Sequence, residues 1–355
     1  MFKSGIADLP LHYGHAPKWL FIKMTKLSRC IAEIIILEYS KKEFLKRISD
    51  PFFFQAFGCA VGFDWHSSGL TTTLTAALKE ARLEDLGIAI LGGKGKASKK
   101  TPNEIENLQT KFSLSDKKIE ELKYASKIVA RVDNNCLQDN FNLYHHSFFV
   151  TENGKWAVVQ QGLNNETKYA RRYHWLSFNL KSFVDEPHLA ICCDVKVKPL
   201  NLVARESEEV REDIVDLTKE NPENLKKYFW VKNSLMKFLK MSAQHEIDLS
   251  LYKKLMDLRN FQPKNFEEIV MMKNIGAKTL RSLALLSNLI YGSEISFRDP
   301  VKYSFAHGGK DKRPYPIDRK TYESSIEILQ DAIRNACLGN REKLEAIKRL
   351  QFFVK

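Results

Sequence analysis

The chain has 355 residues, of which 44% are apolar, so it can bury one large or two to three ordinary hydrophobic cores. Its 56 lysine and arginine residues against 43 acidic residues give a net charge of +13. That balance favours a polyanionic partner, either nucleic acid or an anionic membrane surface. A membrane span is excluded, because Glu33 and Glu38 interrupt the most apolar run before it reaches the roughly 18 to 20 residues required.

Cysteine usage and the N-terminus bear on the compartment. Six cysteines without a CxxC pair match neither a disulfide framework nor a thiolate zinc site. Since the N-terminus also lacks the basic-then-apolar order of a signal peptide, we expect a cytoplasmic protein.

The excess charge is concentrated in the C-terminal third. Residues 226–320 hold 19 basic and 9 acidic residues, whereas residues 127–188 hold 7 and 6. A lysine-rich surface adapted to high temperature would give a similar total. If the charge serves binding, a polyanion is expected to contact the C-terminal third.

Residues 1–127 form a mainly helical region in this interpretation. Apolar residues recur at helical spacing after Pro17, and "SDPFFFQAFGCAVGF" begins a second helix that Ser49 or Asp50 can cap. A third helix follows the turn at Ser68, and a fourth runs from Pro102 to about Ile128. Between them, residues 87–102 turn from apolar to glycine- and lysine-rich, which predicts an exposed loop.

Residues 128–200 have a different pattern, which predicts a central antiparallel sheet. The runs "KIVARVDN", "YHHSFFVT", "KWAVVQQGL", "ARRYHWLS" and "HLAICCDVKV" are short, rich in β-branched or aromatic residues, and separated by turn residues. Asn153 and Gly154 predict a hairpin between the second and third runs.

The remainder is expected to be helical. Residues 201–224 are acidic and predict a linker or a solvated helix, and residues 225–355 predict a helical region interrupted by the loop at 296–319. The predicted fold class is therefore α+β, with an N-terminal helical region, a central antiparallel sheet, and a C-terminal helical region.

The segment from Phe266 to Gly292 has the most interpretable short motif. An apolar helix, a turn at Ile275-Gly276 and a second helix starting near Ala277 resemble a helix-hairpin-helix, a module that binds DNA without reading sequence. The turn carries Asn274 where that motif usually has a glycine. Its predicted phosphate-binding residues are Asn274, Gly276, Lys278, Thr279 and Arg281, with His307 and Lys310 of the following loop as further donors. An ordinary helical hairpin and a proline-braced loop are the alternatives.

Several longer strings go beyond generic patterns. They are "GIADLPLHYGHAPKWL", "DPFFFQAFGCAVGFDWHSSGLTTTLTAALKEA", "VVQQGLNNETKYARRYHWLS", "EPH" and "DPVKYSFAHGGKDKRPYPIDR". Through them the chain resembles, over nearly its full length, a family of archaeal and some bacterial proteins catalogued as the domain of unknown function numbered 763. The resemblance implies an intracellular, archaeal protein and brings no catalytic assignment.

Histidines and carboxylates in polar strings are the candidates for chemistry. Metal-dependent phosphodiester hydrolysis needs carboxylates, often with imidazoles, around one or two divalent ions. The candidate catalytic residues are Asp64, His66, Asp133, His145, His146, His174, Glu186 and His188. Within that set Asp64, His66, Glu186 and His188 are the expected ligands of a Mg or Mn ion. His145 and His146 point to opposite faces of one strand, so only one of them can line a given site.

Each of these residues also has a structural interpretation. A single histidine is more often a hydrogen-bonded structural residue than a ligand, and Asp64 could cap the helix that starts after Ser68. The string "YARRYHW" offers a guanidinium fork and flat rings, so Arg171, Arg172 and Tyr173, with Gln160 and Gln161, are predicted to contact nucleic acid. Aromatic residues on a strand are otherwise core residues.

Three functions are compatible with these features. The first is a divalent-metal-dependent DNA nuclease of repair or recombination that acts on single-stranded or structured DNA. The second is a helix-hairpin-helix glycosylase or lyase, for which Asp299, Lys310 and Asp318 are the candidates. The third is a non-catalytic DNA-binding protein. The oligomeric state is not predicted.

Overall fold

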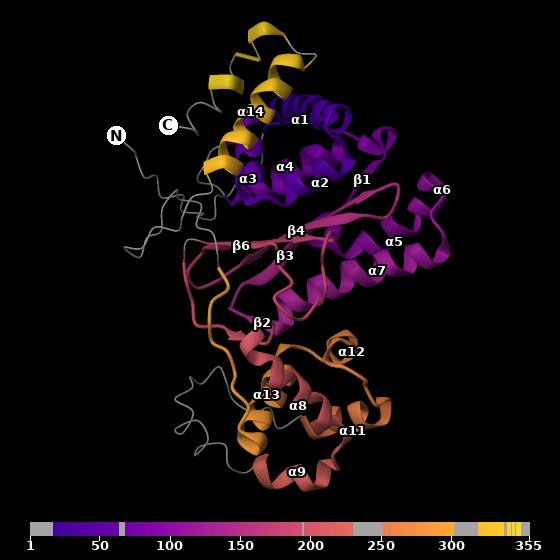
Figure 1. Ribbon diagram of the computed structural model, residues 1–355, viewed down its shortest axis with the longest axis vertical. Coiled ribbons are helices and arrows are strands. Elements are labelled where there is room, and N and C mark those ends of the chain that lie inside the picture. The colour runs from indigo at the N-terminus through magenta and orange to yellow at the C-terminus, as the bar shows by residue number, and fades with distance from the viewer. Residues whose placement is uncertain are drawn as a thin grey trace.

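The computed structural model describes residues 17–63, 68–193, 195–229, 251–301, 319–336, 339–341, 343–344 and 346–348. At its centre lies a five-stranded antiparallel sheet in the order β1-β3-β4-β5-β6, with helices on both faces (Figure 1). Its strands are β1 (Ile88–Lys94), β3 (Asn142–Thr151), β4 (Trp156–Leu163), β5 (Ala170–Leu176) and β6 (Ala190–Cys192). The short strands β2 (Leu137–Gln138) and β7 (Leu200–Asn201) pair separately. The predicted α+β class is confirmed.

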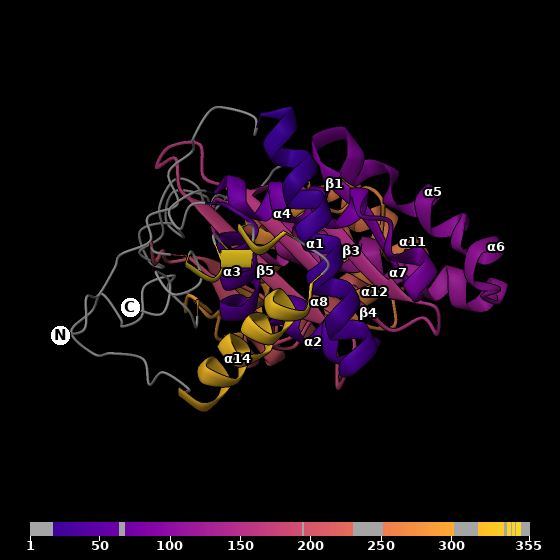
Figure 2. The ribbon, with the colours of Figure 1, turned by 90° about the horizontal axis from the view of Figure 1, so that it is seen from above.

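N-terminal helices cover the first face of the sheet, and one C-terminal helix packs on the outside of them, as Figure 2 shows from above. They are α1 (Lys18–Glu38), α2 (Lys41–Ser49), α3 (Pro51–Ala60), α4 (Gly69–Glu80) and α14 (Arg319–Asn335). Phe149, Ala157 and Val159 of the sheet share one hydrophobic core with these helices. The C-terminal part of the chain therefore returns to pack on the N-terminal helices.

The second face is covered by α5 (Thr101–Glu106), α6 (Leu108–Phe112) and α7 (Asp116–Arg131), and the remaining helices extend the molecule beyond them (Figure 1). The extension consists of α8 (Glu208–Lys219), α9 (Pro222–Phe229), α11 (Leu251–Phe261), α12 (Phe266–Met271) and α13 (Ala277–Tyr291). Phe148, Val158 and Trp175 of the sheet join these helices in a second hydrophobic core. Four short turns of helix connect the larger elements: η1 (Leu83–Leu86), η2 (Gly95–Lys100), η3 (Val132–Cys136) and η4 (Arg205–Ser207).

Local sequence signals explain several element boundaries. The Asp50 carboxylate accepts the Phe53 amide proton at 2.8 Å, which confirms that residue as the cap of α3. The predicted hairpin between β3 and β4 is also confirmed, and Gly154 in its turn has a φ of +75°, a conformation that glycine adopts easily.

Three predictions about elements are wrong. Residues 87–102 were expected to form an exposed loop, but the apolar run Ile88–Leu91 is buried as β1, an edge strand covered on both faces. The run at 127–134 was expected to be a strand, but it continues the helical spacing of α7 and ends in η3. The acidic segment 201–224 was expected to be a linker or a solvated helix; it does contain a helix, α8, but one face of that helix is not solvated, because Val210, Ile214 and Leu217 are buried.

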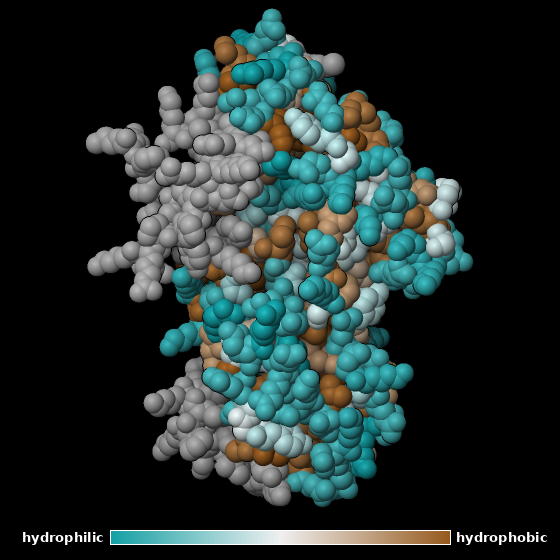
Figure 3. Space-filling model, in the orientation of Figure 1, coloured by the Kyte–Doolittle hydropathy of each residue, from teal (hydrophilic) through white to brown (hydrophobic). Residues whose placement is uncertain are grey.

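The surface is mixed in character. Figure 3 shows a largely hydrophilic face with small hydrophobic groups between the polar side chains. Among the helices of the described ranges, none combines the length and the apolar character needed to cross a lipid bilayer.

Candidate functional site

A buried carboxylate lies where α7 meets the second face of the sheet. Asp133 sits in the π-helical turn η3 and has no exposed surface. Its Oδ1 is 2.5 Å from Nε2 of His188, and its Oδ2 accepts the indole proton of Trp175 at 3.0 Å and an amide proton of Gln160. Three donors from the sheet and from the β5–β6 connection therefore surround one negative charge.

This hydrogen-bond network continues from strand to strand on the face of the sheet that α7 covers. Since Nε2 of Gln160 donates to Asp133, its Oε1 accepts, and Nδ1 of His146 lies 2.7 Å from that oxygen. His146 therefore carries its proton on Nδ1, and Nε2 accepts from the hydroxyl of Ser126 at 2.9 Å. Burial lowers the pKa of His146, so this imidazole is neutral at neutral pH. The chain of donors runs from α7 across β3 and β4 to Asp133.

His145 faces the opposite side of the sheet, as the strand period requires. Its Nε2 lies 3.0 Å from both Thr75 and Ser147, and burial lowers its pKa to about 3. On the same side Gln161 donates to the carbonyl oxygen of Ser68 at 2.8 Å. His145 and His146 thus belong to separate networks, and both are buried.

Arg171 is completely buried between two carboxylates. Its guanidinium donates to Asp139 at 2.9 Å and to Asp299 at 2.8 Å, and it lies over the ring of Phe141. Burial lowers the pKa of Arg171, but the surrounding acidic groups, Asp139 first among them, together raise it above its usual value, so the group stays charged. The hydroxyl of Tyr173 donates to Asp139 at 2.9 Å.

Arg172 points to the other face, into the core below α3 and α4. It contacts Nε2 of His174 at 2.9 Å and Oε1 of Gln55 at 3.1 Å, and it stacks over Phe54. Burial lowers the pKa of Arg172 to about 10, and burial together with the Arg172 charge lowers that of His174 well below its usual value. The nucleic-acid face expected at residues 169–175 is therefore not on the surface, because the side chains of Arg171, Arg172 and Tyr173 are all buried.

The expected metal ligands are only partly within the described residues. Asp64 and His66 lie outside them. Glu186 is exposed and pairs with Arg298 at 3.0 Å, whereas His188 points inward to Asp133. In the described ranges no three histidine, cysteine or acidic side chains are arranged to hold a metal ion.

The α12–α13 hairpin presents a different kind of site, at the surface. Lys273, Asn274 and Lys278 are exposed around the turn, while Ile275 is buried beneath it. Gly276 caps α13 in an extended conformation with φ −129°, and neither it nor Asn274 has a positive φ. The asparagine therefore fits the turn without strain.

The first turn of α13 is open to a ligand. It contains no acidic residue, and among the described residues no side chain caps it. Apart from the two adjoining residues of the chain, no described atom lies within 4 Å of the position that a Cβ of residue 276 would take. Of the other predicted contacts, Thr279 is buried and accepts from Lys254 at 2.7 Å, and Arg281 donates to Gln138 at 2.7 Å. Burial lowers the pKa of Arg281. These two side chains hold the hairpin instead of lining its surface.

Hydrogen bonds attach the α12–α13 hairpin to the chain segments on either side of Asp133. Nη1 of Arg131 donates to the carbonyl oxygens of Val270 and Met272, at 2.7 Å each, and Nε2 of Gln138 donates to that of Ala277 at 2.7 Å. Arg131 precedes Asp133 by two residues. One short segment thus supports both the buried network and the exposed turn.

The candidates for a glycosylase are also only partly described. Both oxygens of Asp299 are engaged, because it accepts from Arg171, from the Val197 amide at 2.8 Å and from the Val301 amide at 3.1 Å. His307, Lys310 and Asp318 lie outside the described residues.

Sequence patterns did not indicate Ser126, Arg131 or Gln138. Each is an ordinary polar residue in a polar string, and its partner is distant in sequence. The sequence did contain one indication of a buried acceptor, because the indole N–H of a tryptophan on a buried strand needs a hydrogen-bond acceptor inside the protein.

These features define a mixed α+β protein in which helices enclose an antiparallel sheet and a helical hairpin projects from it. The chain belongs to the family described as "Protein of unknown function (DUF763)", whose model matches residues 5–317, and this confirms the resemblance inferred from its long strings. Neither a curated protein nor a solved structure matches it.

Proposed function

We propose that this protein binds DNA through the α12–α13 hairpin. The observation that carries this proposal is the open first turn of α13, with Gly276 at its cap and exposed Lys273 and Lys278 on either side. Backbone N–H groups at a helix N-terminus point outward and attract an anion, and lysines add the charge that a phosphate requires. Together they form a binding site for the DNA backbone.

The charge distribution around the hairpin supports the same partner. Within residues 251–281 five basic residues are exposed, namely Lys253, Arg259, Lys264, Lys273 and Lys278. The three acidic residues of this segment are half-buried, and Glu268 uses its carboxylate to accept the amide proton of Lys264 at 2.8 Å. A polyanion approaching this surface therefore meets mainly positive charge.

Binding of this kind depends on phosphates and not on base sequence. The hairpin is expected to accept DNA of many sequences, including single-stranded or structured forms. Its attachment through Arg131 and Gln138 keeps the turn in one orientation, so little ordering is needed when DNA binds.

The test is a measurement of DNA affinity against salt concentration for the full chain and for the double variant Lys273→Gln/Lys278→Gln. Each lost phosphate contact reduces the slope of log affinity against log salt by about 1, so the double variant should lose about 2. Affinity at low salt should fall by the same mechanism.

A matched control is Lys96→Gln/Lys99→Gln, which removes the same charge from exposed residues of η2. It should leave the slope unchanged. If both variants lost the same amount of the salt slope, net charge alone would attract DNA. A wild-type protein without DNA affinity would contradict the proposal.

The pair Asp133–His188 favours a second function, cleavage of the bound phosphodiester. A buried carboxylate that holds one imidazole nitrogen leaves the other free to accept a proton, which is the arrangement of a general base. Only 6% of the His188 side chain is exposed, at the boundary between the network and the surface. In this proposal His188 is the base and Asp133 positions it.

This proposal gives Asp133 no part in binding a divalent ion. Every oxygen of Asp133 is engaged by a protein donor, so this carboxylate does not fit a metal ligand. Dependence on Mg or Mn remains a prediction about the nuclease as a whole, and a chelator tests it.

Cleavage should be measured for the wild type with Mg, with Mn and with a chelator, and for His188→Gln and Trp175→Phe. Both substitutions remove a donor to Asp133, but only the first removes the base. We expect His188→Gln to abolish cleavage and keep DNA affinity, and Trp175→Phe to keep the pH profile of cleavage. Absence of cleavage by the wild type under every condition would leave DNA binding as the function.

A further inference from the structure

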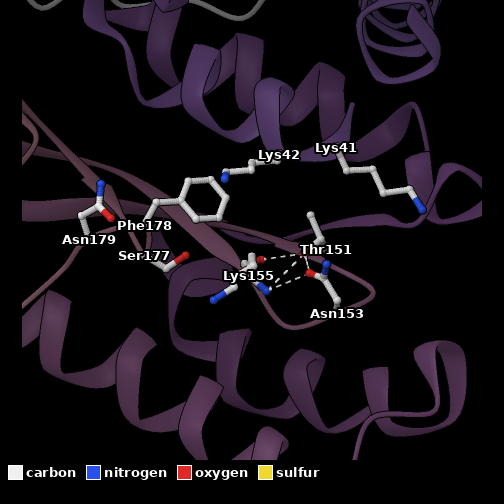
Figure 4. A pocket seen from close by; sticks show the side chains of 8 residues that line it. All are labelled: Lys41, Lys42, Thr151, Asn153, Lys155, Ser177, Phe178 and Asn179. Carbon is white, nitrogen blue, oxygen red and sulfur yellow. Dashed lines mark hydrogen bonds between the residues drawn. The ribbon is translucent and has the colours of Figure 1, made fainter. Parts of the chain in front are cut away.

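A pocket opens between α2 and the tip of the β3–β4 hairpin (Figure 4), on the opposite side of the sheet from α12 and α13 (Figure 1). Its volume is about 350 Å³, within the range of small-molecule sites. Three segments line it, and the lining residues are Lys41, Lys42, Thr151, Asn153, Lys155, Ser177, Phe178 and Asn179. No acidic residue is among them.

The neutral side chains of this pocket offer hydrogen-bond donors. Oδ1 of Asn153 accepts the hydroxyl proton of Thr151 at 2.5 Å, so the amide protons of Asn153 remain for another partner. Oγ of Ser177 accepts the amide proton of Trp156 at 2.9 Å, which leaves the hydroxyl proton of Ser177 to donate. In Asn153 and Ser177 the acceptor oxygen is thus used inside the protein, and a donor remains for a ligand.

Two of the three lysines add uncompensated charge. Lys41 pairs with Glu152, but across the described residues neither Lys42 nor Lys155 has a carboxylate partner. Both are exposed, and Nζ of Lys42 lies 5.4 Å from the centre of the Phe178 ring (Figure 4). Positive charge, surplus donors and an aromatic surface meet in one cavity.

We propose that this pocket binds a phosphate group, as a free phosphate ester or as a phosphate of a nucleic-acid strand. The ammonium groups of Lys42 and Lys155, which have no carboxylate partner among the described residues, and the neutral donors beside them select an anion with several acceptor oxygens. The cavity also has room for the organic part of a phosphate ester, which can lie on Phe178. This site is separate from the DNA contact proposed for α12–α13.

Calorimetric titration of the full chain at low ionic strength tests the proposal with four probes: inorganic phosphate, adenosine 5′-monophosphate, adenosine, and a short single-stranded DNA. The variant is Lys42→Gln/Lys155→Gln, whose side chains are exposed, so folding should be unaffected. Since a charge-assisted hydrogen bond contributes about 1.5 to 3 kcal/mol, the variant should bind phosphate-bearing probes at least about tenfold more weakly.

The control variant Lys96→Gln/Lys99→Gln should bind every phosphate probe within about twofold of the wild type, since a distant surface lysine contributes little. A loss confined to the monophosphate identifies a free ester, and a loss confined to DNA identifies a strand phosphate; either supports the site. Equal binding of adenosine and its monophosphate, or equal affinities of variant and wild type, would overturn it. The hairpin variant Lys273→Gln/Lys278→Gln should bind the monophosphate normally, which separates this site from the proposed DNA contact.

Discussion

The central sheet and the α12–α13 hairpin hold positive charge in opposite ways. In the sheet, Arg171 is fully buried and two carboxylates neutralise it. At the hairpin, Lys273 and Lys278 are exposed and the adjacent helix terminus has no acidic residue. A charge inside the protein stabilises the fold only with its partners, whereas a charge at the surface without partners can serve a ligand. The adjacent arginines of β5, which stand out in the sequence, are therefore structural, and the exposed Lys273 and Lys278 carry the proposed DNA binding.

The largest expected effect is the loss of the buried ion pairs. Arg171→Ala leaves Asp139 and Asp299 buried without a cation, so we expect the free energy of unfolding to fall by about 3 to 5 kcal/mol. Chemical denaturation measures this, with Arg205→Ala at an exposed position as the control that changes stability by less than about 0.5 kcal/mol. A loss as small as in the control would mean that the two carboxylates are not held by this arginine.

Acid should destabilise the sheet through His145. Burial lowers its folded-state pKa to about 3, below the unfolded value of about 6.5, so the unfolded state binds the proton first. The stability from keeping this imidazole neutral is fully present above about pH 6.5 and declines as the pH falls towards 3.

His145→Gln removes this dependence. Between pH 7 and pH 5 the variant should lose about 2 kcal/mol less stability than the wild type. Unfolding curves at several pH values measure the difference, and the slope is informative even if the substitution lowers stability at every pH. Parallel pH profiles would show that His145 is not held neutral.

Arg131 links the two regions. Arg131→Ala removes two hydrogen bonds from a charged donor to the end of α12, so we expect a loss of about 1.5 kcal/mol and faster amide hydrogen exchange in α13. Lys127→Ala, one turn earlier on α7 and exposed, is the matched control and should change neither. Unchanged exchange in α13 would show that the hairpin does not depend on this contact.

The smallest expected change in stability is that of Gly276→Asp, which should stabilise the protein and weaken its binding to DNA. Gly276→Asp supplies a side-chain cap and a negative charge to the N-terminus of α13, so the free energy of unfolding should rise by about 0.5 kcal/mol. DNA affinity should fall several-fold, because the carboxylate occupies the proposed phosphate position. Gly276→Ala controls for the loss of glycine. If Gly276→Asp bound DNA as tightly as the wild type, the hairpin would not be the DNA-binding site.

Hydrophobic periodicity and turn residues predicted the parts of the fold that depend on local interactions. The cap at Asp50, the β3–β4 hairpin and the start of α13 follow from neighbouring residues, and the structure has all of them. Strand β1 was missed because a run of four buried apolar residues has no period, and only its pairing with β3 makes it a strand.

The candidate sites likewise include features that local sequence predicts and features that depend on distant residues. The opposite faces of His145 and His146 follow from the strand period, and the basic turn at Gly276 follows from the short motif. The burial of Arg171 was not predictable, because it depends on Asp139 and Asp299, which are 32 and 128 residues away in the sequence.

The sequence by itself therefore determined the family, the α+β class and the exposed basic turn, since each depends on local order along the chain. Only the tertiary structure decided which charged residues face one another. A guanidinium on a strand looks identical whether it meets a phosphate outside or a carboxylate inside, and the packing of distant segments determines which of the two it contacts.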